Sequence, residues 1–219
     1  MRTATITLHD TNNAGSSLQS YALQHFLLEN GIENEIIDYV PRYVETNGRL
    51  WKTLARKLIY WRESKEQKQN FQLFKQQFLK VTPRRYRTYE ELIQDPPFAD
   101  CFIAGSDQIW NASYACGRDP AFYLEFAKGP KISYAASIGK EEIPEEEQVL
   151  YSRFLQGYHA ISVREQSSQV FLSQQLQREI GYVCDPVLLN PVETYRSIQS
   201  SPLIREPYPL VYLVAPGEL

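Results

Sequence analysis

The chain has 219 residues and a formal net charge of −3, with 43% hydrophobic and 22% charged residues. This balance excludes a mostly disordered chain and suits one large or two small domains with a buried core. Three widely spaced cysteines exclude a disulfide framework and a Cys-x-x-Cys metal site. The N-terminal residues lack a signal-peptide pattern and no apolar stretch is long enough to span a bilayer, so we expect a soluble, cytoplasmic protein.

The beginning of the chain predicts a strand, a helix and a second strand. Residues 3–8 are rich in β-branched side chains, as strands are. From Leu18 to Leu28 apolar residues recur every three or four positions, which is the period of a helix, and Gly31 follows its end. Residues 35–39 then predict a second strand. This order implies parallel pairing through a right-handed crossover.

Residues 49–80 predict a helical insertion that interrupts the α/β alternation. The segment 49–87 holds 12 Lys and Arg against 2 Asp and Glu. A basic amphipathic helix over 49–62 is typical of contact with an anionic membrane surface. The alternative, which we favour, is a helical hairpin packed on the sheet with a solvated basic face. No stacking motif or known module indicates a nucleic-acid partner.

The alternation resumes after residue 87. Thr88 and Glu91 have the spacing of a capping box for a short helix. Further strands are predicted over 99–104, 131–136, 159–163 and 181–184, and helices over 144–156 and 165–176. The α/β pattern predicts a mostly parallel sheet with helices on both faces.

The end of the chain carries a domain prediction. Three prolines between 200 and 209 predict a linker, and residues 210–214 are strand-like. We expect one domain over residues 1–199, followed at 200–219 by a linker and the first strand of a largely absent second domain. The alternative is that this strand pairs at the edge of the first domain.

Polar residues follow five of the predicted strands. The carboxyl ends of parallel strands meet at one edge of the sheet, where open α/β sheets bind ligands. The candidate binding residues are small, hydrogen-bonding or charged: His9, Asn12, Asn13, Gly15, Gly105, Ser106, Gln108, Trp110, Asn111, Ser137, Gly139, Arg164 and Asp185. Each group alone also has a structural interpretation as a helix cap, a turn or an ion pair.

Common catalytic motifs are missing from the sequence. It contains no G-x-G-x-x-G, Walker A, H-E-x-x-H or G-x-S-x-G pattern. This argues against a dinucleotide enzyme, an ATPase, a zinc protease and a lipase-like hydrolase.

Several blocks in order resemble the polysaccharide pyruvyl transferase family. The most specific is Gly-Ser-Asp-Gln-Ile-Trp-Asn at 105–111. The others lie at 13–24, 35–39, 134–139, 161–165 and 184–189. Two departures are Ala14, where the family usually has an aromatic residue, and Cys184, where a less reactive residue is common.

The resemblance implies a Rossmann-like first half of a two-domain, glycosyltransferase-B-like architecture with the site in the cleft. It implies transfer of pyruvate from phosphoenolpyruvate to two hydroxyls of a sugar, which forms a cyclic ketal in cell-surface polysaccharide synthesis. The family's Arg-x-His block for phosphoenolpyruvate would lie in the second domain. We therefore expect this chain to form mainly the acceptor side and to be inactive by itself.

This chemistry needs an acid, a base and cations for a carboxylate and a phosphate, but no metal or cofactor. Asp10, Asp107 and Glu165 are the candidate acids and bases, and Arg164 is the one candidate cation. The expected partners are phosphoenolpyruvate and a sugar or lipid-linked oligosaccharide, with contact to the inner membrane through 49–62. The alternatives are a nucleotide-sugar-dependent glycosyltransferase and a non-catalytic glycan-binding or assembly module.

Overall fold

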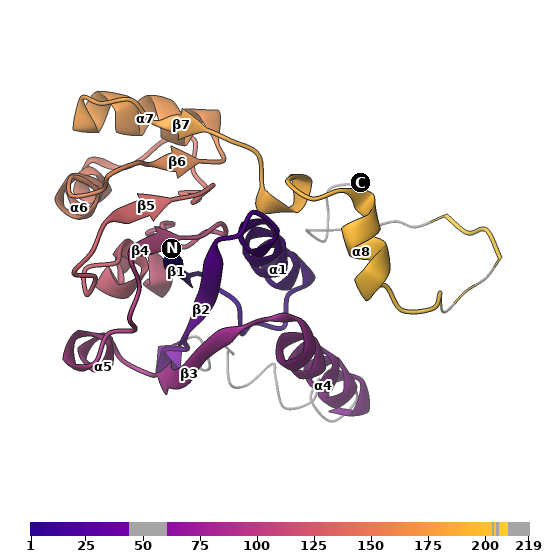
Figure 1. Ribbon diagram of the computed structural model, residues 1–219. Coiled ribbons are helices and arrows are strands. Elements are labelled where there is room, and N and C mark those ends of the chain that lie inside the picture. Colours follow the sequence, from indigo (N-terminus) through magenta and orange to yellow (C-terminus); the bar gives the residue numbers. More distant parts are fainter. Residues whose placement is uncertain (44–60, 203, 205, 210–219) are drawn as a thin grey trace.

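A parallel five-stranded sheet forms the centre of the structure, a computed structural model that describes residues 1–43, 61–202, 204 and 206–209. Its strands are β1 (Arg2–Ile6), β2 (Glu33–Tyr39), β3 (Val81–Tyr86), β4 (Cys101–Ala104) and β5 (Lys131–Ser133). They lie in the order β3-β2-β1-β4-β5, and each neighbouring pair is parallel (Figure 1). The parallel α/β sheet predicted from the sequence is therefore confirmed.

Two further strands extend the sheet beyond β5. β6 (Ser162–Val163) and β7 (Gly181–Tyr182) pair with each other in parallel. Single parallel bridges join Ile132 to Ala160 and Ala136 to Val163. The strand order thus continues from β5 to β6 and β7, and the direction of winding reverses between β1 and β4. That reversal is a topological switch point, which is where doubly wound sheets bind ligands.

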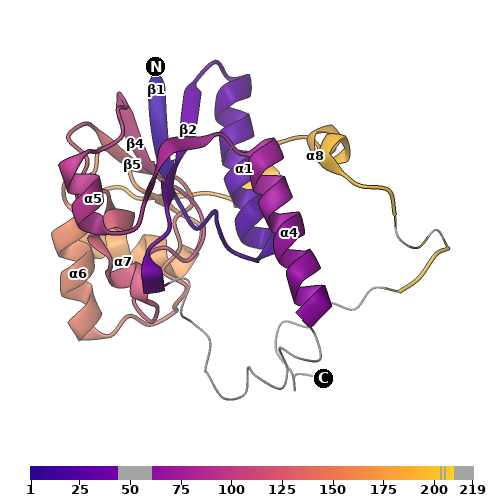
Figure 2. The same cartoon turned by 90° about the horizontal axis from the view of Figure 1, so that it is seen from below.

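Helices cover both faces of the sheet. One face carries α1 (Ala14–Glu29), α4 (Trp61–Phe78) and α8 (Val192–Ile198), and the other carries α5 (Tyr89–Gln94), α6 (Glu145–Leu155) and α7 (Gln166–Leu176) (Figures 1 and 2). Three short 3-10 helices are η1 (Ala115–Arg118), η2 (Pro120–Tyr123) and η3 (Pro186–Leu188). In the part of the chain that the structure describes, no helix is long and apolar enough to cross a bilayer. The layered arrangement is Rossmann-like.

The segment after β2 keeps the α/β alternation. Helix α4 is followed by β3, which pairs in parallel with β2, so α4 lies in a β-α-β crossover. The sequence pattern does not predict this strand, because Pro83, Arg84 and Arg85 give it no apolar alternation. The rest of the predicted basic helix, residues 49–60, lies outside the described residues. So does the predicted strand at 210–214, and the proposed domain boundary stays a prediction.

The predicted helix starts are present in the structure. Asn13 is the N-cap of α1, and its Oδ1 accepts a hydrogen bond from the Ser16 amide at 3.1 Å. Thr88 caps α5, where its Oγ1 accepts from the Glu91 amide at 3.3 Å. The Glu91 carboxylate in turn accepts from the Arg87 amide at 2.6 Å. These caps satisfy backbone donors that the first helical turn leaves unpaired.

The loop after β4 is anchored in the core. Trp110 is 0% exposed, and its Nε1 donates to the Phe122 carbonyl at 3.1 Å. Its ring is stacked on Tyr123 with the ring centroids 5.8 Å apart. Tyr151 from α6 donates to the Trp110 carbonyl at 2.8 Å. This aromatic packing holds the loop that follows Asp107 in one conformation.

Candidate active site

Two adjoining cavities lie at the switch point, between the loops that follow β1 and β4. Both are lined by Asn13, Ser16 and Asp107. One also reaches Gly15, Gln19, Arg164, Asp185 and Val187. The other reaches Leu8, Thr11, Tyr43, Gln108, Tyr114, Ala115 and Cys116. We call the two cavities together the switch-point groove.

Asp107 lies at the centre of the groove and is held rigidly. Its backbone has a φ of 90°, a left-handed conformation that is strained for a residue with a Cβ. Its Oδ2 accepts a hydrogen bond from Ser16 Oγ at 2.6 Å, and its Oδ1 accepts from the Gln108 amide at 2.8 Å. Both donors are uncharged, and each carboxylate oxygen has a further lone pair that can accept a hydrogen bond from a ligand.

Arg164 and Asp185 form an ion pair at the rim of the groove. Arg164 Nη1 lies 2.8 Å from Asp185 Oδ2, and each side chain is less than one third exposed. Ser106 Oγ donates to the same oxygen at 3.2 Å, and the Val187 amide donates to Asp185 Oδ1 at 3.0 Å. The one cation predicted for this rim is therefore already paired with a carboxylate, which reduces its attraction for a phosphate or carboxylate ligand.

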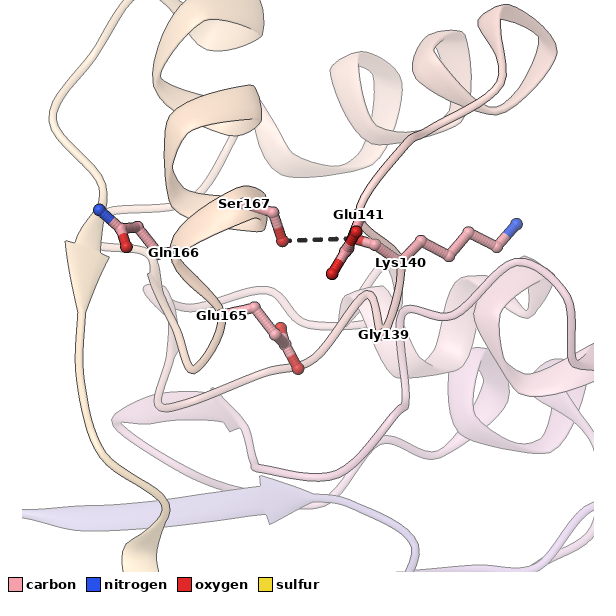
Figure 3. Close-up of a pocket in the computed structure, with 6 residues that line it drawn as sticks. All are labelled: Gly139, Lys140, Glu141, Glu165, Gln166 and Ser167. Carbon is pink, nitrogen blue, oxygen red and sulfur yellow. Dashed lines mark hydrogen bonds between the residues drawn. The ribbon is translucent and has the colours of Figure 1, made fainter. Parts of the chain in front are cut away.

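A smaller pocket lies beside the groove at the start of α7, lined by Gly139, Lys140, Glu141, Glu165, Gln166 and Ser167 (Figure 3). Glu165 accepts hydrogen bonds from Ser137 Oγ at 2.5 Å and Ser168 Oγ at 3.2 Å. Figure 3 shows the Lys140 side chain extending away from Glu165, and its Nζ donates to both Glu147 carboxylate oxygens at 2.7 Å. With Lys140 paired to Glu147, the other charged residues of this lining are two carboxylates, Glu141 and Glu165.

His9 and Asp10 belong to a separate charged network over β2 and β3. Asp10 Oδ2 lies 3.0 Å from Lys75 Nζ and 2.8 Å from Arg85 Nη2. The same two cations contact Asp38, at 2.9 Å each, and His9 Nε2 lies 3.0 Å from Asp38 Oδ1. Burial raises the pKa of Asp38, but hydrogen bonds from His9, Lys75 and Arg85 outweigh burial and hold that pKa well below its usual range. Neither His9 nor Asp10 lines the groove.

The structure divides the predicted site residues into groups. Six line the groove: Asn13, Gly15, Asp107, Gln108, Arg164 and Asp185. Gly139 and Glu165 line the smaller pocket, while Ser106 and Ser137 are buried and hold Asp185 and Glu165 in place.

The remaining predicted residues line neither the switch-point groove nor the smaller pocket. Gly105 lies close to β1. A Cβ added at this position would lie only 3.0 Å from Thr5 Cγ2, so glycine permits the close contact between the end of β4 and β1. Trp110 and Asn111 are buried, and Asn12 is exposed on the loop. Within the described ranges, no group of three His, Cys, Asp or Glu side chains is arranged to hold a metal ion.

Sequence reasoning missed several lining residues, notably Ser16 and Gln19. Ser16 follows the N-cap Asn13 by three positions and Gln19 follows Ser16 by three, so each lies about one helical turn after the one before. That spacing was a usable signal. Tyr43 and Cys116 gave no comparable signal, because they reach the groove through the tertiary fold alone.

The doubly wound sheet, with a polar groove at its switch point, defines the class of protein as a Rossmann-like α/β protein. The comparisons with known proteins are more specific. The family model for polysaccharide pyruvyl transferase matches residues 13–215, and the chain belongs to that family. No curated protein and no solved structure matches the chain.

Proposed function

We propose that this chain forms the acceptor side of an enzyme that transfers pyruvate from phosphoenolpyruvate to a sugar. The product is a cyclic ketal, made in the cytoplasm for a cell-surface polysaccharide. Membership of the family supports the transferase class. The charge of the groove is our reason for assigning this chain to the acceptor side. Among the described residues, Asp107 has only uncharged hydrogen-bond donors, and Arg164 is paired with Asp185. Such a groove repels the carboxylate and phosphate of phosphoenolpyruvate and accepts hydroxyl groups.

The reaction requires two additions at one carbon. An acid protonates the methylene carbon of phosphoenolpyruvate, which leaves positive charge on the neighbouring carbon. One sugar hydroxyl adds there and loses its proton to a base. Phosphate then leaves as the second hydroxyl adds and loses its own proton. Asp107 is our candidate for the base, because its carboxylate faces the groove and is fixed by Ser16 and Gln108.

Asp107→Asn tests this role. In an enzyme that joins this chain to a phosphoenolpyruvate-binding domain, we expect the substitution to lower the rate of ketal formation by roughly 100-fold or more, because the amide does not take up the hydroxyl proton. Phosphate release and the ketal methyl signal in NMR would be followed with phosphoenolpyruvate and a panel of glycans. Asp95→Asn is the matched control, since Asp95 is exposed and pairs with Arg84 on the surface. Equal rates for both variants would contradict the role of Asp107.

The same assay separates the alternatives. We expect this chain alone to release no phosphate and the chain joined to a phosphoenolpyruvate-binding domain to release it. Turnover with a nucleotide sugar instead would favour a glycosyltransferase, and saccharide binding without any turnover would favour a glycan-binding module. Contact with the inner membrane through 49–62 stays a separate prediction. Failure to co-sediment with anionic vesicles at low salt would contradict it.

A further inference from the structure

Gln19 has a buried amide whose orientation is fixed by its neighbours. The residue is 3% exposed, lies on α1 and lines the switch-point groove. Its Nε2 has two hydrogens to donate and lies within hydrogen-bond distance of three acceptors, the Ser16 carbonyl at 3.0 Å, Thr7 Oγ1 at 3.0 Å and Ser20 Oγ at 2.9 Å. A carbonyl oxygen only accepts hydrogen bonds, so the NH₂ end of the amide must face Ser16. Oε1 is therefore the end of the amide that points away from these three acceptors.

That Oε1 is a buried acceptor without a donor among the described residues. Folded proteins rarely leave such an atom unpaired, and a buried group of this kind calls for an explanation such as a ligand or a bound water. Its neighbours in the groove point to the kind of ligand. Asp107 adds a carboxylate with free lone pairs, and Gly15 lies in the first turn of α1, where backbone N–H groups lack helical partners.

The balance of donors and charges favours an uncharged polyol. Asp107 and Asp185 carry two negative charges against one positive charge on Arg164, which Asp185 already neutralises. A carboxylate or phosphate ligand would add a further negative charge beside Asp107. A hydroxyl group donates one hydrogen bond and accepts others, so it matches acceptors such as Oε1 and donors such as Gly15 together.

We propose that Gln19 and Asp107 bind two hydroxyl groups of an uncharged sugar, and that this pair selects against acidic sugars. Gln19 is then a specificity-determining residue whose Oε1 accepts one hydroxyl hydrogen. The identification of this sugar with the pyruvate acceptor rests on the proposed function. The hydrogen-bonding and charge argument does not depend on any reaction.

Ligand titrations followed by protein NMR test the wild-type groove without phosphoenolpyruvate-dependent turnover. The probes are the methyl glycosides of glucose, galactose and mannose, the matching methyl uronosides, inorganic phosphate and phosphoenolpyruvate. We expect at least one neutral glycoside to bind more tightly than its uronoside and than either phosphate compound. Tighter binding of an anion, or no binding of any neutral glycoside at the solubility limit, would overturn the proposal and leave water as the partner of Oε1.

A pair of glutamine variants tests the role of Gln19. Gln19→Met removes the acceptor, and we expect it to weaken neutral glycoside binding about tenfold, as the loss of one good hydrogen bond does. Gln24→Met is the control, because Gln24 lies on the same helix with the same 3% exposure. Its Nε2 donates to the Lys80 carbonyl and its Oε1 accepts from the Lys80 amide, so both ends are satisfied away from the groove. An unchanged dissociation constant for a folded Gln19→Met would overturn the proposal.

Asp107→Asn provides an independent test if Gln19→Met does not fold. It keeps an acceptor oxygen but removes the charge, and Asn tolerates a left-handed backbone. We expect the preference for a neutral glycoside over its uronoside to fall by about tenfold. An unchanged preference would contradict the charge argument. Binding as expected, but no ketal formation when the phosphoenolpyruvate-binding domain is joined to this chain, would refute the proposed function alone. Ketal formation with a preference for acidic sugars would refute this inference alone.

Discussion

Gly31 and Gly139 both have a left-handed backbone, with φ of 73° and 65°, but their surroundings differ. A Cβ at Gly31 would meet nothing within 4 Å. At Gly139 it would lie 2.9 Å from Asn111 Nδ2 and 3.1 Å from Gln108 Cδ. Those two side chains are joined by a hydrogen bond of 3.1 Å, and Gln108 lines the switch-point groove. Gly139 therefore supports the groove by leaving room for its neighbours.

Substitution by alanine separates these two roles of glycine. Gly31→Ala should cost about 1 kcal/mol of unfolding free energy, because only the left-handed backbone is disfavoured. Gly139→Ala should cost about 1–3 kcal/mol more, because the methyl group also crowds the side chains of Asn111 and Gln108. Urea unfolding of both variants measures the difference. Equal losses would show that Asn111 and Gln108 move aside without cost.

At the scale of elements, the charged network links α4 and β3 to the loop after β1. Lys75 from α4 and Arg85 from β3 each contact both Asp10 and Asp38. The pairing of β2 with β3 shifts register between Ile36 and Asp38, which is a bulge next to the network. Bulges of this kind redirect side chains, and here Arg85 lies opposite Asp38. The network therefore fixes the loop that leads to Asn13.

Lys75→Met tests how much this link contributes to stability. The Lys75 side chain is 12% exposed and that of Asp38 is 9% exposed, so the contacts are partly shielded from solvent. We expect a loss of about 2 kcal/mol, between the values for surface and buried pairs. Lys68→Met on the exposed face of the same helix should change stability by no more than about 0.5 kcal/mol. Similar losses for both variants, measured by urea unfolding, would show that the network adds nothing specific.

The sequence predicted α1 from apolar residues that recur every three or four positions, and it predicted strands such as β1 and β4 from their β-branched and apolar residues. It missed β3 because this edge strand is stabilised by pairing with β2 and by the Arg85 contacts, which are tertiary. It missed α8 because that helix has no buried residue of its own and packs only partly, through Tyr195 and Ile198.

The candidate site was predicted as one rim, and the strand order explains why the rim divides. β1 lies between β2 and β4, so residues of the loop after β1 can contact elements on both sides. His9 and Asp10 contact residues of β2, β3 and α4, whereas Asn13 and Ser16 face Asp107 after β4. Parallel pairing follows from the order of elements along the chain, but the lateral order of strands does not. The sequence therefore predicted that these residues lie at one edge of the sheet, but not that they form two separate groups there.

For the whole molecule, Asp38 predicts how stability depends on pH. Its pKa in the folded protein lies well below the usual value of 3.8, because hydrogen bonds from His9, Lys75 and Arg85 outweigh the effect of burial. A group with a lowered folded pKa stabilises the fold above its unfolded pKa, and this contribution is lost as the pH falls toward the folded value. The contribution of Asp38 is thus complete at neutral pH and decreases below about pH 4.

Asp38→Asn isolates this contribution, because the other carboxyl groups titrate in both proteins and largely cancel in the difference. We expect the variant to be less stable than the wild type at pH 7 and the gap to narrow steadily as the pH falls from 5 to 3. Urea midpoints across this range measure the gap. Asp95→Asn, at an exposed position, should leave a small gap at every pH. A gap for Asp38→Asn that stays constant with pH would mean that the lost stability comes from altered packing and not from the charge of the network.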